Sequence, residues 1–177
     1  MLSQKAKVLQ TLGGRTMLNH VLIAANKISN KISVVVGFDK EGVEDEIKKI
    51  GINADTYLQK KQIGTADAVK TTLKDIDKNE KILILYGDVP LIKEETLKKL
   101  CNQESDLSIL TTNLENPTGY GRALKDKENN VLGIIEEKDA DLEQQKIKEI
   151  FTGILVTKGC VLTVSYTHLT LPTKRIV

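Results

Sequence analysis

The feature that most constrains the fold of this chain is a regular alternation, up to residue 114, of short apolar runs with segments of helical periodicity. The apolar runs are rich in β-branched residues, as buried strands are, and the helical segments are about ten residues long. Strands that alternate with helices of this length build βα units around a sheet. The sequence therefore predicts an α/β fold in which helices cover both faces of a mostly parallel sheet. Strands are expected over Ile32–Phe38, Asp55–Gln59, Lys81–Tyr86 and Leu107–Leu114, and helices over Thr16–Ser29, Glu41–Ile50, Thr65–Ile76 and Lys93–Asn102.

The alternation ends near Gly121. Residues Arg122–Lys125 and Val131–Glu136 flank a polar turn and predict a β-hairpin, and Leu142–Ile147 predicts a short charged helix. At 177 residues the chain is long enough for one domain with a substantial core and too short for two large ones.

Composition argues against several classes of protein. The net charge is +2, with the basic residues spread along the chain, and there is no Trp and only two Phe, so nothing predicts a nucleic-acid partner. The longest apolar runs are far too short to cross a bilayer, and the N-terminus lacks the apolar stretch of a signal peptide. Cys101 and Cys160 have no metal-type spacing, and no disulfide is expected between them. We therefore expect a cytoplasmic protein that binds neither nucleic acid nor membrane.

Asp88 is the first candidate for chemistry. It follows the strongest strand of the sequence and a glycine, and ligands of open α/β sheets bind at the carboxyl ends of strands. A carboxylate in that position suits Mg²⁺, which takes one or two protein oxygens and shares its other positions with substrate phosphates. The alternative is a turn residue that hydrogen-bonds its own backbone ahead of Val89-Pro90.

Gln59, Gly64 and Thr65 form a second candidate, in the loop between a weak strand and a helix. Glycine allows close approach of the backbone, and a helix N-terminus offers free N–H groups to an anion or to a base carbonyl. The alternative is simple capping, with Thr65 as the N-cap residue of the helix.

Three further features are weak when taken alone. Pro117–Arg122 is a glycine-rich turn, and Glu136–Asp139 is a charge run of the kind that usually forms a solvated face. Lys7 is expected to be solvated unless the fold places it at a phosphate. His20 and His168 have no partner at ligand spacing, and we expect neither to be catalytic.

Taken together and in order, these segments resemble a known enzyme family, the uridylyltransferase domain of N-acetylglucosamine-1-phosphate uridylyltransferase. The resemblance runs from about Met1 to about Val156. The most specific segments are Leu85-Tyr-Gly-Asp-Val-Pro-Leu91 and Pro117-Thr-Gly-Tyr-Gly-Arg122. It also rests on Lys7-Val-Leu9, Asn19-His-Val21, Gln59 with Gln62-Ile-Gly-Thr65, Gly133-Ile-Ile-Glu-Glu-Lys-Asp-Ala140 and Thr152-Gly-Ile154.

The resemblance implies a Rossmann-like nucleotidyltransferase fold and transfer of a uridylyl group from UTP to N-acetylglucosamine 1-phosphate, giving UDP-N-acetylglucosamine and pyrophosphate. It also implies roles for single residues. The uracil would be held by Gln59, Gly64 and Thr65, and the nucleotide and sugar site would be lined by Tyr86, Gly87 and Asp88. The sugar would form hydrogen bonds with Gly121 and Glu136. Lys7 would contact phosphate, and Asp88 would ligate Mg²⁺. Lys7 and Asp88 are the residues expected to act in catalysis.

The chain also departs from the family. The opening strand and the triphosphate loop of the family are not found, Phe151 stands where the family has Asn, and a second metal ligand lies beyond the end of the chain. The β-helix acetyltransferase domain, through which the parent is expected to form a homotrimer, is absent as well. We therefore expect this chain to be impaired as an enzyme. The open alternatives are another sugar-1-phosphate nucleotidyltransferase and a fragment that only binds a sugar nucleotide.

From about Gly159 the family resemblance stops. The segment resembles the translation of a sequencing adapter or of cloning read-through joined to a truncated gene, and the alternative is a divergent native strand. The sequence thus predicts a partial nucleotidyltransferase domain over residues 1–158 and an unmatched tail over residues 159–177.

Overall fold

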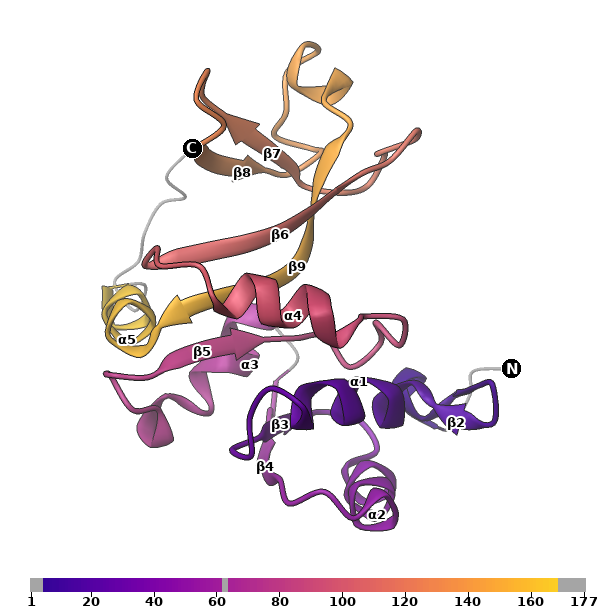
Figure 1. Cartoon of the computed structure of the whole chain (residues 1–177). Helices are drawn as coiled ribbons and strands as arrows, with labels where there is room; N and C mark the ends of the chain where they lie inside the picture. The colour runs from indigo at the N-terminus through magenta and orange to yellow at the C-terminus, as the bar shows by residue number, and fades with distance from the viewer. Residues whose placement is uncertain (1–4, 62–63, 169–177) are drawn as a thin grey trace.

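The computed structural model describes residues 5–61 and 64–168, and its elements follow the expected alternation (Figure 1). Its helices are α1 (Met17–Asn26), α2 (Lys40–Ile50), α3 (Thr65–Lys70), α4 (Glu94–Cys101) and α5 (Gly159–His168), with single 3₁₀ turns η1 (Lys7–Leu9), η2 (Leu73–Asp75) and η3 (Gln144–Lys146). Its strands are β1 (Thr11–Leu12), β2 (Arg15–Thr16), β3 (Ser33–Val36), β4 (Asp55–Leu58), β5 (Lys81–Ile84), β6 (Leu107–Asn113), β7 (Arg122–Lys125), β8 (Val131–Ile135) and β9 (Glu149–Lys158).

The N-terminal third builds one core. Strands β3 and β4 pair in parallel, with Ser33 opposite Asp55 and Val36 opposite Leu58. Helices α1 and α2 pack against them, because their apolar residues recur at helical spacing on the buried side. The buried residues of this cluster are Leu18, Leu22, Val36, Val43 and Ile47.

The rest of the molecule is organised around β9. Strand β6 pairs along one edge of β9, while β5 and then β7 pair along the other, and β8 completes the hairpin with β7. A second core, formed by Leu97, Leu100, Ile154 and Val156, packs α4 on this sheet. Figure 1 shows β9 curving from the β7–β8 hairpin down to β5.

The expectation of a mostly parallel sheet needs correction. Only β3 and β4 form a parallel pair among the described residues, and every ladder made by β9 is antiparallel. The reason is that β9 is antiparallel to each of its neighbours and lies between β5 and β6. Two strands with the same direction are therefore not adjacent in this sheet. The α/β nucleotidyltransferase fold itself is confirmed by the similar solved structures reported below.

Local signals explain most element boundaries. The Thr16 hydroxyl caps α1 by accepting a bond from the Asn19 N–H at 3.0 Å, and Gly51, at φ 74°, ends α2. The helix expected over Thr65–Ile76 is shorter, since α3 ends at Lys70 and a 3₁₀ turn follows. Its N-cap is Gly64 rather than Thr65, and Gly64 has φ 121°, which favours glycine.

Two segments differ from the sequence-based expectations. No strand was predicted over β9, although Ile150–Thr157 is rich in β-branched residues and could have indicated one. The helix expected at Leu142–Ile147 is only the single turn η3. The hairpin of β7 and β8 is confirmed.

The segment after residue 158 begins as helix α5 rather than as a strand. The Gly159 N–H donates to the Glu80 carbonyl at 2.8 Å, and Leu162 is buried. Residues 169–177 of the unmatched tail lie outside the described residues, and the division at residue 158 stays a prediction. Among the described helices, none combines the length and the apolar character that a bilayer crossing requires.

Candidate active site

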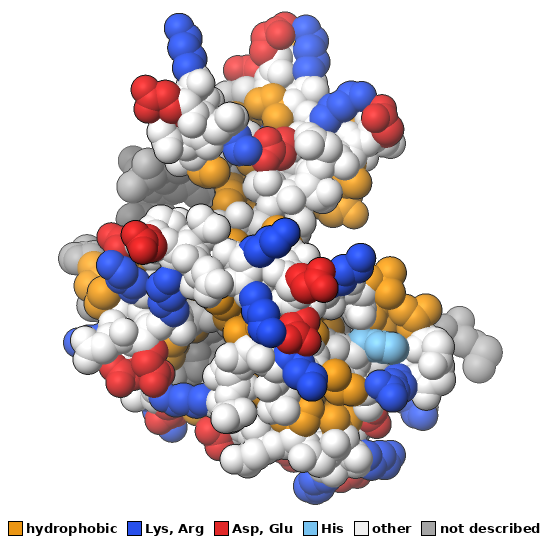
Figure 2. Space-filling view, viewed as in Figure 1, with side chains coloured by type: hydrophobic (Ala, Val, Ile, Leu, Met, Phe, Trp, Pro, Cys, Tyr) orange, Lys and Arg blue, Asp and Glu red, His pale blue; other side chains and the backbone are white. Residues whose placement is uncertain are grey.

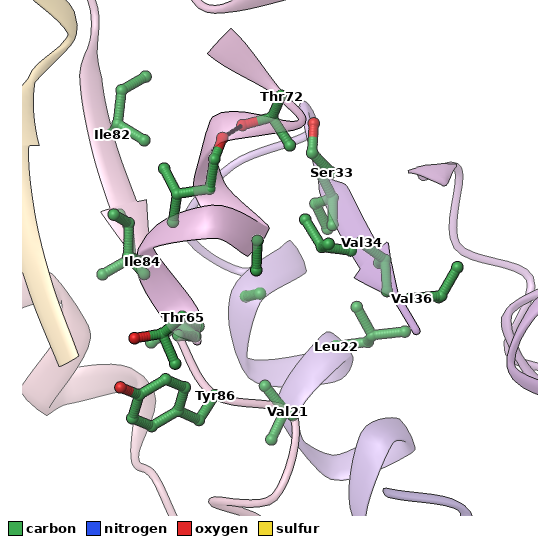
Figure 3. A pocket seen from close by; sticks show the side chains of 18 of the residues that line it. Val21, Leu22, Ser33, Val34, Val36, Thr65, Thr72, Ile82, Ile84 and Tyr86 are labelled. Atoms are coloured by element: carbon green, nitrogen blue, oxygen red, sulfur yellow. Dashed lines mark hydrogen bonds between the residues drawn. The ribbon is translucent and has the colours of Figure 1, made fainter. Parts of the chain in front are cut away.

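Six of the predicted site residues line one cavity of about 940 Å³ between the β3–β4 pair and β5 (Figure 3). They come from η1 and from the segments that follow β4 and β5, so the carboxyl ends of two strands meet there, as expected for an open α/β sheet. The six are Lys7, Gln59, Gly64, Thr65, Tyr86 and Gly87. Asp88 joins them through its bond to Lys7.

Lys7 and Asp88 form an ion pair at the rim of this cavity. The Lys7 ammonium donates to Asp88 Oδ2 at 2.7 Å, and their side chains are 72% and 33% exposed. The Asp88 carboxylate raises the pKa of Lys7, mainly through this hydrogen bond, and Tyr120 contributes slightly in the same direction. Lys7 thus remains largely exposed to solvent, as its sequence position suggested, but it is paired with a carboxylate. A cation and a carboxylate lie side by side at the end of β5.

Gly87 is required by the close approach of η1. A Cβ at position 87 would lie 3.1 Å from Val8 Cγ1, which is tighter than ordinary van der Waals contact. The absence of a side chain therefore lets the Lys7–Leu9 turn sit directly over the end of β5. This packing explains why Lys7 reaches Asp88.

Gln59 is held in place by its own loop. Its side-chain amide Nε2 donates to the Gly64 carbonyl at 3.0 Å and to Asp67 Oδ2 at 3.1 Å. Because both bonds engage the amide nitrogen, the side-chain carbonyl is oriented away from Gly64 and Asp67. Sequence reasoning missed Asp67, since its bond to Gln59 spans eight residues across a turn and follows no local motif. Gln62 and Ile63 of the quoted motif lie outside the described residues.

Tyr86 packs on a glycine of β9. A Cβ at Gly153 would lie 1.8 Å from Tyr86 Cε2, and Gly153 has φ 84°. No other residue type fits there without moving the ring. The Thr152-Gly-Ile154 segment thus supports Tyr86 from behind, which is a role that sequence reasoning did not assign.

Gly121 and Glu136, the predicted sugar contacts, lie together but apart from the cavity lining. A Cβ on Gly121 would be 3.7 Å from Glu136 Oε1 and 2.9 Å from Ile134 Cγ2. The Gly121 carbonyl accepts a bond from the Phe151 N–H at 2.9 Å, so Phe151 of β9 adjoins this pair.

A buried arginine fixes the turn that leads to Gly121. Arg122 is 1% exposed, and its guanidinium donates to Glu137 at 2.5 Å and also to the Tyr120 carbonyl. Glu137 accepts a further bond from the Gly119 N–H at 3.2 Å. Arg122 lowers the pKa of Glu137 through this bond. The charge run at 136–139 is therefore not only a solvated face, because one of its carboxylates neutralises a buried cation.

Figure 2 shows the surface indented between the part formed by β7 and β8 and the part that carries α1 and α4. Lys7 precedes α1 and Tyr120 lies just before β7, and Tyr120 acts electrostatically on Lys7. The predicted phosphate and sugar residues thus belong to two parts of the chain, one next to α1 and one next to β7.

The structure contains no cluster of three or more acidic, His or Cys side chains among the residues it describes. Asp88 is the candidate metal ligand, as a hard carboxylate at a strand end with a third of its side chain exposed. This donor set fits Mg²⁺ that takes its remaining ligands from phosphates and water. It does not fit a metal bound by protein groups alone.

Residues 2–144 match one protein family, described as the MobA-like NTP transferase domain. The chain is a member of this family. That match covers all of the predicted site residues.

Two curated relatives resemble this NTP transferase domain over most of its length. The "Bifunctional protein GlmU" of Thermosipho melanesiensis is 44% identical over 161 residues, which is 89% of this chain and 34% of the relative. The protein of the same name from Francisella tularensis subsp. novicida is 46% identical over 155 residues, which is 86% of this chain and 33% of the relative. The chain spans about a third of the length of these relatives.

A solved structure supports the fold. The apo form of a UDP-glucose pyrophosphorylase superimposes with a TM-score of 0.72 at 12% identity, over 91% of this chain and 71% of that one. At this identity the similarity concerns the fold only. The NTP transferase domain described here thus has the α/β fold expected from its sequence, although its sheet is not mostly parallel.

Proposed function

We propose that this chain carries the site for uridylyl transfer from UTP to N-acetylglucosamine 1-phosphate, with release of pyrophosphate. The observation that carries the proposal is the Lys7–Asp88 pair at the carboxyl end of β5, beside the loop that holds Gln59. It is supported by the similarity to the two GlmU proteins and by membership of an NTP transferase family. A cytoplasmic location and a longer, bifunctional parent protein belong to the same proposal.

The reaction depends more on neutralising the negative charges of the two substrates than on proton transfer. A sugar phosphate is already ionised near neutral pH, so one of its phosphate oxygens can attack the α-phosphorus of UTP directly. The new O–P bond forms as the bond between the α-phosphorus and the bridging oxygen to the β-phosphate breaks, and pyrophosphate takes the electron pair. No protein base is required, and the barrier lies in bringing anions together in line.

The residues of the site suit that task. Lys7 supplies a cation next to Asp88, and it can pair with phosphate oxygens in exchange for Asp88. Asp88 would hold Mg²⁺, which when bound supplies positive charge to the phosphates. The loop of Gln59 offers an oriented carbonyl oxygen, and the Gly64–Thr65 backbone offers N–H groups. These match the N–H and the carbonyl groups of uracil.

In the same proposal Gly121 and Glu136 bind the sugar. The Arg122–Glu137 pair holds the turn that carries Gly121, so both contacts are fixed before the sugar arrives. Phe151 adjoins Gly121 and has an apolar side chain that can make no hydrogen bond to a hydroxyl group. We therefore expect weak sugar binding and slow turnover in this chain.

The test is product formation by an Asp88→Asn variant. The substitution keeps the shape of the side chain and removes the charge that would hold Mg²⁺, so UDP-N-acetylglucosamine formation should fall by orders of magnitude. Product is measured by mass spectrometry after long incubation at high protein concentration. Asp106→Asn is the matched control, because Asp106 also pairs with a lysine, Lys158 at 2.6 Å, but lies outside the site. Equal rates for Asp88→Asn and the control would remove Asp88 from the metal site.

A further inference from the structure

Asp67 is a charged residue beside the candidate site that the proposed function does not use. It lies in the first turn of α3 and is partly buried. An acidic side chain in that position usually stabilises its helix through the free N–H groups of the first turn. Here its Oδ2 accepts a hydrogen bond from the side chain of Gln59 at 3.1 Å. This use of the carboxylate bears on the ligand, because of the two residues only Gln59 lines the cavity.

Gln59 is anchored through both its backbone and its side chain. Its backbone N–H donates to the Val36 carbonyl at 2.8 Å, which holds the residue at the end of β4. Its side-chain Nε2 donates to the Gly64 carbonyl at 3.0 Å as well as to Asp67. A side-chain amide nitrogen has two N–H groups, so these two bonds use both of them. The carbonyl oxygen Oε1 is then the polar atom of Gln59 that is left for a ligand.

The two acceptors decide the orientation of the Gln59 amide. If the amide were turned over, Oε1 would face the Gly64 carbonyl and the Asp67 carboxylate, and three acceptors would meet with no proton between them. Asp67 contributes more than Gly64, because hydrogen bonds to an ionised acceptor are roughly twice as strong as those between neutral groups. Its negative charge also polarises the amide, which makes Oε1 a stronger acceptor. Asp67 therefore sets the orientation of a group that faces the cavity.

An acceptor at Oε1 distinguishes the two pyrimidine bases of RNA nucleotides. Uracil carries an N–H at ring atom N3, whereas cytosine carries a lone pair there, and the two rings are of similar size. Oε1 can accept a hydrogen bond from the N–H of uracil and repels the lone pair of cytosine. With the amide turned over, Nε2 would donate to cytosine instead and would oppose the N–H of uracil. The orientation of one amide thus selects between the two bases.

We propose that Asp67 is a positioning residue that fixes the Gln59 amide with Oε1 toward the base, and that it thereby makes the site prefer uracil to cytosine. The inference rests on the proposed function, because it takes Gln59 as a residue that faces the base. It adds to that function the residue through which the choice of base is made, although Asp67 itself does not touch the nucleotide. A site whose polar groups match one ligand discriminates against a ligand that leaves those groups unpaired or opposed.

The substitution that tests the proposal is Asp67→Asn. Asparagine keeps the shape of the side chain but is neutral, and it can offer Gln59 either an oxygen or an N–H₂ group. It therefore no longer favours one orientation of the Gln59 amide by its charge. Asp75→Asn is the matched control, since Asp75 also accepts a bond from a side chain of this segment, but its partner is the Tyr57 hydroxyl at 2.9 Å.

Two NMR measurements on the ¹⁵N-labelled chain give the readouts. In the first, without nucleotide, the Gln59 side-chain protons are identified by their absence in Gln59→Leu. They should exchange with water more slowly in the wild-type chain and in Asp75→Asn than in Asp67→Asn. In the second, titrations with UTP and with CTP in the presence of Mg²⁺ give the ratio of the two Kd values. We expect the wild-type chain and Asp75→Asn to bind UTP at least about tenfold more tightly than CTP, and Asp67→Asn less than about threefold more tightly.

Two results would overturn the inference and leave the proposed function intact. One is a wild-type preference for UTP that Asp67→Asn keeps in full, which would mean that Asp67 acts only on the stability of α3. The other is equal exchange of the Gln59 protons in the wild-type chain and in Asp67→Asn. A wild-type chain that binds the two nucleotides equally, or binds neither, would contradict the proposed function, and the inference would fail with it.

Discussion

Lys7 and Asp88 are 81 positions apart in the chain and 2.7 Å apart in the structure. Asp88 could be singled out from its place after a strong strand, whereas Lys7 gave no signal of its own without the family resemblance. A lysine is solvated by default, and only the packing of Val8 on Gly87 brings this one to a carboxylate. Long-range pairs of this kind depend on tertiary packing, which a single sequence does not display.

The pair makes a prediction for the titration of Lys7. Asp88 raises the pKa of Lys7 above its ordinary value of 10.5. Because the folded protein then holds this proton more tightly than the unfolded chain, the pair stabilises the fold at pH values below 10.5. That contribution is lost as the pH rises through the raised pKa. The ion pair is therefore intact throughout the neutral range.

The measurement is an NMR titration of the Lys7 ammonium after ¹³C-methylation of the lysines. In the wild-type chain we expect a midpoint above 10.5, and in Asp88→Asn a midpoint that returns toward that value. Lys148, an exposed lysine paired with the highly exposed Glu115, serves as an internal reference that should not respond to Asp88→Asn. A Lys7 midpoint that is the same in both proteins would contradict the pair.

At the scale of elements, β9 connects β5, at the candidate site, to the hairpin of β7 and β8. Gly153 lies at the centre of this strand, with φ 84° and the Tyr86 ring against its Cα. The glycine lets β9 bend between its two sets of partners and lets the ring pack behind the site.

Gly153→Ala should therefore destabilise the protein. The new Cβ meets the Tyr86 ring, and alanine is strained at this φ, so we expect a loss of at least about 2 kcal/mol in the free energy of unfolding. Urea denaturation with an unchanged m-value measures it. Gly133→Ala in β8 is the control, because a Cβ there has no neighbour within 4 Å. Equal stabilities of the two variants would show that Gly153 and Tyr86 are not in contact.

The elements themselves were mostly predictable from the sequence. Residues 17–50 and 94–113 carry clear periodicity, and the predicted helices and strands there are confirmed within a few residues. β9 was not predicted, and its strand signal is weakened by Gly153, which interrupts the β-branched run. The ladder directions were missed for a physical reason, since strand order depends on contacts between distant segments and not on local pattern.

At the scale of the whole molecule, the candidate site is formed where two parts meet. η1 and the residues after β4 and β5 supply the proposed nucleotide contacts, and the residues just before β7 and just after β8 supply the proposed sugar contacts. The sequence indicated each set through its glycines and the family resemblance. It did not indicate Asp67, Glu137 or Gly153, which hold those contacts in position.

A panel of nucleotides shows whether this site selects a uridine nucleotide, as we propose. Equal concentrations of UTP, dTTP, CTP and GTP are incubated separately with N-acetylglucosamine 1-phosphate, Mg²⁺ and the chain, and the sugar nucleotides formed are measured by mass spectrometry. We expect UDP-N-acetylglucosamine to be the main product, and we expect Asp88→Asn to abolish its formation. Preferential formation of a dTDP-, CDP- or GDP-sugar, or no product with UTP from a chain shown to be folded by a cooperative thermal melt, would contradict it.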